Sequence, residues 1–197
     1  KYRRRQWDTM LRPYLHEWQL EQLLTPITTV SVDLVSGQQH VQKQGDAVQS
    51  ILDSINLPGL SPPLCRNGMA LVDGGVLNNL PADVLISQGA DYVIAVDVGS
   101  HLPEEFSGNR PDTATHLMTA PNVLETLTRA FSVQSSQMNR FGAQPADFHI
   151  DPDTSTFTPA DFDRAVDIAR IGHLATEPRI EDLRQALTKV DASLAQQ

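Results

Sequence analysis

The sequence predicts an α/β fold, and three observations support this class. A β-branched run at residues 27–35 alternates apolar and polar side chains, as a strand with one buried face does. An apolar run at 69–72 is followed by a helical segment and then by a third apolar run at 92–98. Strand, helix and strand within about 30 residues are typical of a right-handed βαβ unit. With 197 residues, the chain is long enough to bury one substantial core.

The first half of the chain predicts a hairpin and a capped helix. Residues 36–37 can turn the first strand, so that 40–44 return beside it as a second strand. Asp46 can cap a helix over 46–55, where apolar residues recur on one face. Prolines and glycines at 58–63 then predict a loop that leads into the strand at 69–72.

The second half predicts helices and a long loop. Asn79 is placed to cap a helix that has Pro81 in its first turn, and Gly89 is placed to end it. The run at 92–98 is almost wholly apolar, as in a parallel strand that is covered on both faces. Residues 99–121 contain no element and predict a flexible loop, either a functional flap or a mobile connection. Helical spacing resumes near Val123, after Asp161 and near Pro178.

Charge is unevenly distributed along the chain. The net charge is −9, yet residues 1–12 hold five basic side chains and one acidic one. An acidic body of this kind argues against general nucleic-acid binding. Residues 1–18 also predict an amphipathic helix whose apolar face is rich in aromatic side chains. That face can lie on an anionic membrane surface or pack against the rest of the protein, which is the commoner use.

Three further features bear on location. No apolar run approaches the roughly 18 residues that a membrane-spanning helix needs. The single cysteine, Cys65, excludes an internal disulfide and is compatible with a reducing compartment. We therefore expect the protein in the cytoplasm or on the cytoplasmic side of a membrane. The chain starts at Lys1 without an initiator Met or signal peptide, so we expect it to be part of a longer protein.

Two aspartates occupy the ends of predicted strands, where ligands of open α/β sheets bind. Asp73 is followed by Gly74 and Gly75, which permit positive φ and a close approach of backbone or ligand. Taken alone, an aspartate before two glycines is more often a turn than a site. Asp97 is placed either to cap the loop at Gly99 or to bind a divalent cation together with Asp73.

Three ordered segments carry a resemblance to a known family. Residues 61–65, residues 71–83 with the sequence Leu-Val-Asp-Gly-Gly-Val-Leu-Asn-Asn-Leu-Pro-Ala-Asp, and residues 89–100 resemble the C-terminal half of patatin-like phospholipases. The neuropathy target esterase branch is the most similar. The resemblance implies a three-layer α/β/α patatin-like fold, of which residues 1–197 form the C-terminal part of one domain.

The resemblance also implies a chemistry. Patatin-like phospholipases are serine lipid acyl hydrolases that use a Ser-Asp dyad, and Asp73 falls on the dyad aspartate, with Gly74 and Gly75 completing its motif. Such a carboxylate orients the serine hydroxyl and accepts its proton as an ester is attacked. No histidine and no cofactor are required. The implied substrates are phospholipids or lysophospholipids.

One part of the family pattern is missing. The family carries its serine in a G-x-S-x-G elbow and its oxyanion hole in a glycine-rich loop, and neither occurs in this sequence. Ser100 follows Gly99, but the next residues break the elbow pattern. We therefore expect the serine upstream of Lys1, in the N-terminal part of the same domain, and this chain alone to be inactive. Two alternatives stay open: a non-catalytic interaction module, and a metal site for phosphoryl chemistry at Asp73 and Asp97.

Overall fold

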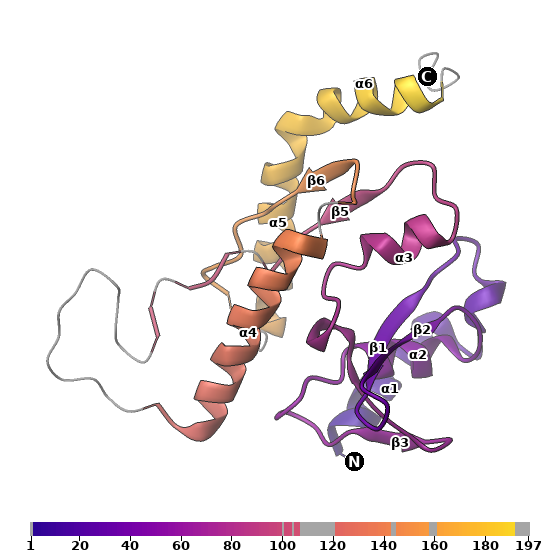
Figure 1. Ribbon diagram of the computed structural model, residues 1–197, viewed down its shortest axis with the longest axis vertical. Helices are drawn as coiled ribbons and strands as arrows, with labels where there is room; N and C mark the ends of the chain where they lie inside the picture. The colour runs from indigo at the N-terminus through magenta and orange to yellow at the C-terminus, as the bar shows by residue number, and fades with distance from the viewer. Residues whose placement is uncertain are drawn as a thin grey trace, which may run out of the picture. The chain divides into compact units, whose positions relative to one another are not determined.

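A computed structural model describes residues 2–99, 101–103, 105–106, 121–142, 145–157 and 161–191 of the chain (Figure 1). The chain divides into two compact units, Lys1–Asn79 and Leu80–Gln197. Both combine helices with strands, so the α/β class predicted from the sequence is confirmed. Among the described residues, no helix is both long enough and apolar enough to cross a membrane.

The first unit is built on a four-stranded antiparallel sheet. Its strands are β1 (Thr29–Asp33), β2 (Gln38–Gln42), β3 (Leu64–Arg66) and β4 (Met69–Asp73), in the spatial order β2-β1-β4-β3. Helix α2 (Ala47–Ser54) packs against β1 and β4, and it buries Val48 and Leu52. The two central strands are buried on both faces: Val30, Val32 and Val72 lie on one face of the sheet, and Leu71 lies on the other. The predicted hairpin of β1 and β2 is confirmed.

The N-terminus of α2 is tied to a second helix by a charged pair. Asp46 accepts a hydrogen bond from the backbone N–H of Gln49 at 2.7 Å, so the predicted helix cap is confirmed. The same carboxylate binds the Arg12 guanidinium through two bonds of 2.7 and 3.1 Å. Arg12 belongs to α1 (Tyr2–Leu15), which packs on α2. Burial raises the pKa of Asp46, but the hydrogen bonds from Arg12 and Gln49 outweigh it and hold that pKa below its usual value.

Asp33 closes the β1–β2 turn and connects it to β4. Its carboxylate accepts hydrogen bonds from the backbone N–H of Ala70 on β4 at 2.9 Å and from the Ser36 hydroxyl at 2.7 Å. The N–H groups of Val35 and Ser36 add two more. These bonds, with that from Ala70 foremost, lower the pKa of Asp33 to about 2. The hairpin and the central strand are therefore locked in one register by a charged side chain.

A second ion pair joins β3 to α2. The Arg66 guanidinium on β3 binds the carboxylate of Asp53, which is 1% exposed and also accepts a hydrogen bond from Gln49 at 2.9 Å. The sequence did not indicate β3 as a strand, because its three residues follow two prolines and show no alternation. This strand is the second neighbour that makes β4 a central one.

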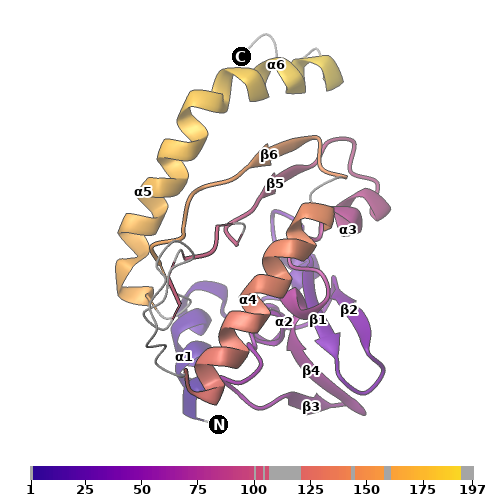
Figure 2. The ribbon, with the colours of Figure 1, turned by 60° about the vertical axis from the view of Figure 1, so that its left-hand side comes forward.

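The second unit begins with α3 (Ala82–Ser87) and contains a short parallel sheet (Figure 2). Strand β5 (Ile94–Val96) pairs with β6 (Phe148–Ile150). The remaining elements are α4 (Val123–Gly142), α5 (Ala165–Thr176) and α6 (Ile180–Val190), with 3-10 turns before α5 and α6. Arg179, in the turn before α6, lies 4.3 Å from the Phe148 ring centroid, so this turn contacts β6.

The predicted βαβ unit is wrong. Strand, helix and strand follow in the expected order, but β4 and β5 belong to different sheets. Strand β4 has β1 and β3 as its strand partners, and both are antiparallel to it. Strand β5 pairs instead with β6, more than 50 residues further along the chain, which local sequence could not reveal.

Three finer predictions in this part of the chain also need correction. Asn79 does not cap α3, since Pro81 occupies the cap position and makes no side-chain cap bond. The strand at 92–98 is not covered on both faces in the described part, where Ile94 and Val96 are 41% and 49% exposed. The predicted loop at 99–121 lies largely outside the described residues, as does Lys1. Gly89 does follow α3 with φ of 89°, as predicted.

Candidate functional site

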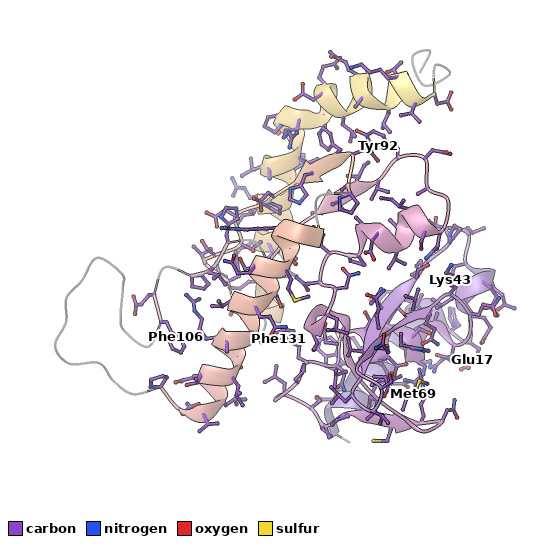
Figure 3. All side chains as sticks on the ribbon, viewed as in Figure 1. Glu17, Lys43, Met69, Tyr92, Phe106 and Phe131 are labelled. Atoms are coloured by element: carbon purple, nitrogen blue, oxygen red, sulfur yellow. The ribbon has the colours of Figure 1, made fainter. Side chains whose placement is uncertain are left out.

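Asp73 is the last residue of β4, the central strand that Met69 begins in Figure 3. Its backbone stands opposite Ser31 of β1. Its N–H donates to the backbone carbonyl oxygen of Asn56 at 2.9 Å. The main chain at Asp73 is therefore fixed from both sides, which holds a carboxylate at the end of a central strand.

The Asp-Gly-Gly motif forms a short 3-10 turn, Gly74–Val76, directly after the strand. The Asp73 Oδ1 atom accepts a hydrogen bond from the Gly75 N–H at 2.8 Å, and the N–H groups of Leu77 and Asn78 donate to the Gly74 carbonyl oxygen. The turn that the sequence suggested is present. It does not exclude a functional role, because the turn occupies only Oδ1.

The electrostatics of Asp73 favour a proton acceptor. Burial raises the pKa of its carboxyl group above the ordinary value of 3.8, and the hydrogen bond from Gly75 opposes this shift only in part. Within the described part of the chain, Oδ2 accepts no hydrogen bond and no basic side chain pairs with the carboxylate. A half-buried carboxylate with one unoccupied oxygen can accept a proton from a hydroxyl placed beside it.

The two glycines of the motif are required for close approach to neighbouring atoms and not for a positive φ angle. Neither has a positive φ. A Cβ atom on Gly74 would lie 2.4 Å from the Val30 carbonyl oxygen of β1, so only glycine lets the turn pass this close to the neighbouring strand. A Cβ on Gly75 would meet the side-chain oxygen of Asn79 at 2.7 Å. The first contact is with strand backbone, whereas the second is with the ends of side chains, since Asp73 Oδ1 would also lie 3.0 Å from that Cβ.

Asp97 has a structural role. It follows β5, is 4% exposed, and its Oδ1 atom accepts hydrogen bonds from the Gly99 N–H at 2.9 Å and from the Asn139 amide at 2.5 Å. The prediction that Asp97 caps the loop at Gly99 is confirmed. The described residues contain no group of three or more His, Cys, Asp or Glu side chains that could hold a metal ion.

Two of the histidines have carboxylate partners that the sequence did not suggest. His101 Nε2 lies 3.2 Å from Asp151 Oδ1, which joins the segments that follow β5 and β6. His173 Nε2 lies 3.5 Å from Glu177 one helical turn away. Neither pair includes Asp73, and His116 and Ser100 lie outside the described residues. The structure thus places no histidine on Asp73 among the residues it describes, as a dyad mechanism allows.

Sequence reasoning missed Asn56, whose contacts place it within the site. It precedes Asp73 by 17 residues and lies in the loop after α2, so neither spacing nor a motif connects the two. Its carbonyl oxygen receives the Asp73 N–H, and its side-chain amide donates to the carbonyl oxygens of Pro62 at 3.1 Å and Leu71 at 3.2 Å.

Comparison with known proteins yields relatives along most of the chain, although no family model matches it. An uncharacterized NTE family protein of Mycobacterium tuberculosis is 29% identical over 186 residues, which cover 88% of this chain. Lysophospholipase NTE1 of Yarrowia lipolytica is 30% identical over 80% of the chain. Patatin-like phospholipase domain-containing protein 6 of Homo sapiens is 44% identical over 91 residues, or 45% of the chain. The chain is a homologue of the patatin-like phospholipases, near their neuropathy target esterase branch.

The chain spans only part of the length of these relatives. It covers 32% of the mycobacterial protein, 12% of the yeast lysophospholipase and 7% of the human protein. The α/β class of its two units is consistent with part of the three-layer α/β/α fold that the resemblance implies.

The two glycines of the motif should respond differently to the same change. We expect Gly74→Ala to lower the free energy of unfolding by about 1–3 kcal/mol or more, because its methyl group would collide with the Val30 backbone. Gly75→Ala should cost clearly less, since the Asn79 side chain can move away. Urea unfolding of both variants measures the difference. Equal losses would show that the approach of Gly74 to β1 does not constrain the turn.

Proposed function

We propose that this chain supplies the aspartate of a Ser-Asp dyad to a patatin-like lipid acyl hydrolase. The observation that carries the proposal is the Asp73 carboxylate at a central strand end, where burial raises its pKa and Oδ2 is unoccupied by any described residue. The homology to patatin-like phospholipases supports it independently. Phospholipids or lysophospholipids are the substrate class, because relatives carry the names phospholipase and lysophospholipase.

In the proposed reaction, Asp73 accepts the proton of a serine hydroxyl through Oδ2 as the serine oxygen attacks the ester carbonyl carbon. The C–O bond to the alcohol then breaks, the alcohol leaves with the proton from Asp73, and the acyl group stays on the serine. A water molecule then attacks the acyl-serine carbonyl carbon and gives its proton to Asp73. The serine oxygen leaves with that proton, and the fatty acid is released. The hydrogen bond from Gly75 keeps Oδ1 occupied, so it fixes the orientation in which Oδ2 faces the serine.

The proposal places the serine and the oxyanion loop N-terminal to Lys1. Neither the elbow pattern nor a glycine-rich oxyanion loop occurs in the 197 residues, and the matched relatives are at least about three times longer than the part they share with this chain. The chain by itself should then bind no acyl group covalently. It acts as the base-carrying part of a domain.

Asp73→Asn in the full-length protein tests this function. We expect kcat/KM for lysophospholipid hydrolysis to fall by about 10²- to 10⁴-fold, because an amide cannot accept the serine proton. The matched control is Asp91→Asn, the same change at an exposed carboxylate, which should keep the wild-type rate. A near-normal rate in Asp73→Asn would rule out the dyad role, and loss of activity on adding EDTA would favour metal-dependent chemistry instead.

The loss of rate expected for Asp73→Asn tests the dyad only if the variant stays folded. The raised pKa of Asp73 predicts the sign of the change in the free energy of unfolding. Because burial raises the pKa of Asp73, its ionised form costs folding free energy above that pKa, and the cost vanishes when the group is protonated at low pH. Asparagine carries no charge at any pH and can still accept the Gly75 N–H. The variant should therefore be at least as stable as the wild type at pH 7.

We further propose that α1 docks on a lipid surface. The apolar face predicted for residues 1–18 is divided in the structure: Trp7, Leu11 and Leu15 are half-buried, whereas Met10, Tyr14 and Trp18 are exposed. The Arg12 guanidinium pairs with Asp46, and this ion pair holds α1 against α2. The exposed side chains of Met10, Tyr14 and Trp18 remain accessible. The sequence also carries three arginines at positions 3–5, and basic residues near an apolar helix face suit anionic lipid.

Co-sedimentation with phosphatidylserine-containing vesicles tests this docking. We expect replacement of Arg3, Arg4 and Arg5 by Glu, or of Met10 and Tyr14 by Ser, to reduce the bound fraction of the full-length protein. Val166→Ser on α5, which is 84% exposed, removes an apolar side chain elsewhere and should leave binding unchanged. Binding that persists in both α1 variants would refute the lipid role of the helix.

A further inference from the structure

The end of β4 lacks a regular strand partner on one side. Alternate residues of a strand direct their N–H and C=O groups to opposite neighbours. The Ala70 carbonyl oxygen accepts from Leu34 on the β1 side, so the backbone groups of Leu71 and Asp73 are directed toward the β3 side. Strand β3 pairs with β4 only as far as Leu64 opposite Leu71. Continuing this register would place Pro62 opposite Asp73, and proline has no N–H to donate.

Asn56 occupies the position that a strand residue would fill there. Its carbonyl oxygen accepts the Asp73 N–H at 2.9 Å, and its side-chain amide donates to the Leu71 carbonyl oxygen at 3.2 Å. The same amide nitrogen donates to the Pro62 carbonyl oxygen at 3.1 Å. Asn56 is 8% exposed, so these bonds are formed away from water, where loss of a donor is expensive. One residue thus binds β4 on either side of Val72 and also fixes the proline segment.

Ser54, two residues before Asn56, binds the neighbouring strand β1. The Ser54 hydroxyl donates to the Val30 carbonyl oxygen at 2.8 Å. That oxygen is the one a Cβ on Gly74 would strike. The last residue of α2 therefore fixes β1 behind Gly74, and the loop after α2 fixes β4 at Asp73. Together they set the position of the Asp-Gly-Gly turn relative to both central strands.

From these contacts we infer that Asn56 is a positioning residue for Asp73: it completes the sheet beside a proline and thereby holds the Asp73 carboxylate at the distance that serine activation needs. This inference rests on the proposed dyad function. Without the amide, the loop that carries the Asn56 carbonyl is released from Leu71 and Pro62, and the Asp73 N–H loses its fixed acceptor. A displacement of a catalytic group by about 1 Å can cost about 100-fold in rate.

The test compares variants of the full-length protein in steady-state hydrolysis of a lysophospholipid. We expect Asn56→Ala to lower kcat by about 10- to 100-fold, with KM close to the wild-type value, because the change acts through the position of Asp73. Asn56→Ser, which retains one donor, should lose less. The matched control is Ser50→Ala, which removes a fully buried hydroxyl that donates to the carbonyl oxygen of Asp46 at the start of α2.

The two kinds of failure are distinguishable. If Ser50→Ala lowers the melting temperature as much as an Asn56 variant does and keeps its kcat, the rate effect at Asn56 is not a general consequence of lost stability. If Asn56→Ala does not fold, Asn56→Ser takes its place in the test. The positioning role then requires that the kcat of Asn56→Ser is lower than that of Ser50→Ala. Normal kcat in folded Asn56 variants, beside an inactive Asp73→Asn, would overturn the positioning role alone. An active Asp73→Asn would overturn the dyad itself.

Discussion

The site depends on the confinement of β4 between two antiparallel neighbours. The strand pairs with β1 through its last residue and with β3 through its first three, and the hydrogen bonds of Asn56 complete the second side. Charged contacts around it, from Asp33 to Ala70 and from Arg66 to Asp53, fix the register of the surrounding elements. The carboxylate is placed by this backbone frame, since its own side chain makes a single hydrogen bond within the described part.

Burial and incomplete hydrogen bonding act together on the chemistry of Asp73. Asp33, a strand-end aspartate of the same sheet, accepts four hydrogen bonds and has its pKa lowered to about 2. Asp73 accepts one and has its pKa raised by burial. The first arrangement stabilises the charge for structural purposes, whereas the second leaves a more basic carboxylate with a free oxygen. This contrast within one sheet supports a chemical role for Asp73.

Local patterns revealed the elements and the aspartate, but not what surrounds them. Alternation, capping residues and turn residues indicated the β1–β2 hairpin, α2 with its Asp46 cap, and β4 ending at Asp73, because these depend on neighbours in the chain. The pairing of β5 with β6 and the strand β3 depend on distant partners and were missed. Asn56 was missed for the same reason, since a loop amide acquires its function only when Pro62 and Leu71 are brought beside it.

The most direct measurement is the rate at which a fluorophosphonate labels the full-length protein, because the reagent reports serine activation without substrate binding. The account predicts one modified serine, identified by mass spectrometry in a G-x-S-x-G sequence N-terminal to Lys1, and a labelling rate that falls sharply when Asp73 is replaced by Asn. Labelling that is equally fast in the variant, or the absence of any labelled serine in an active protein, would contradict the assignment of Asp73 as its base.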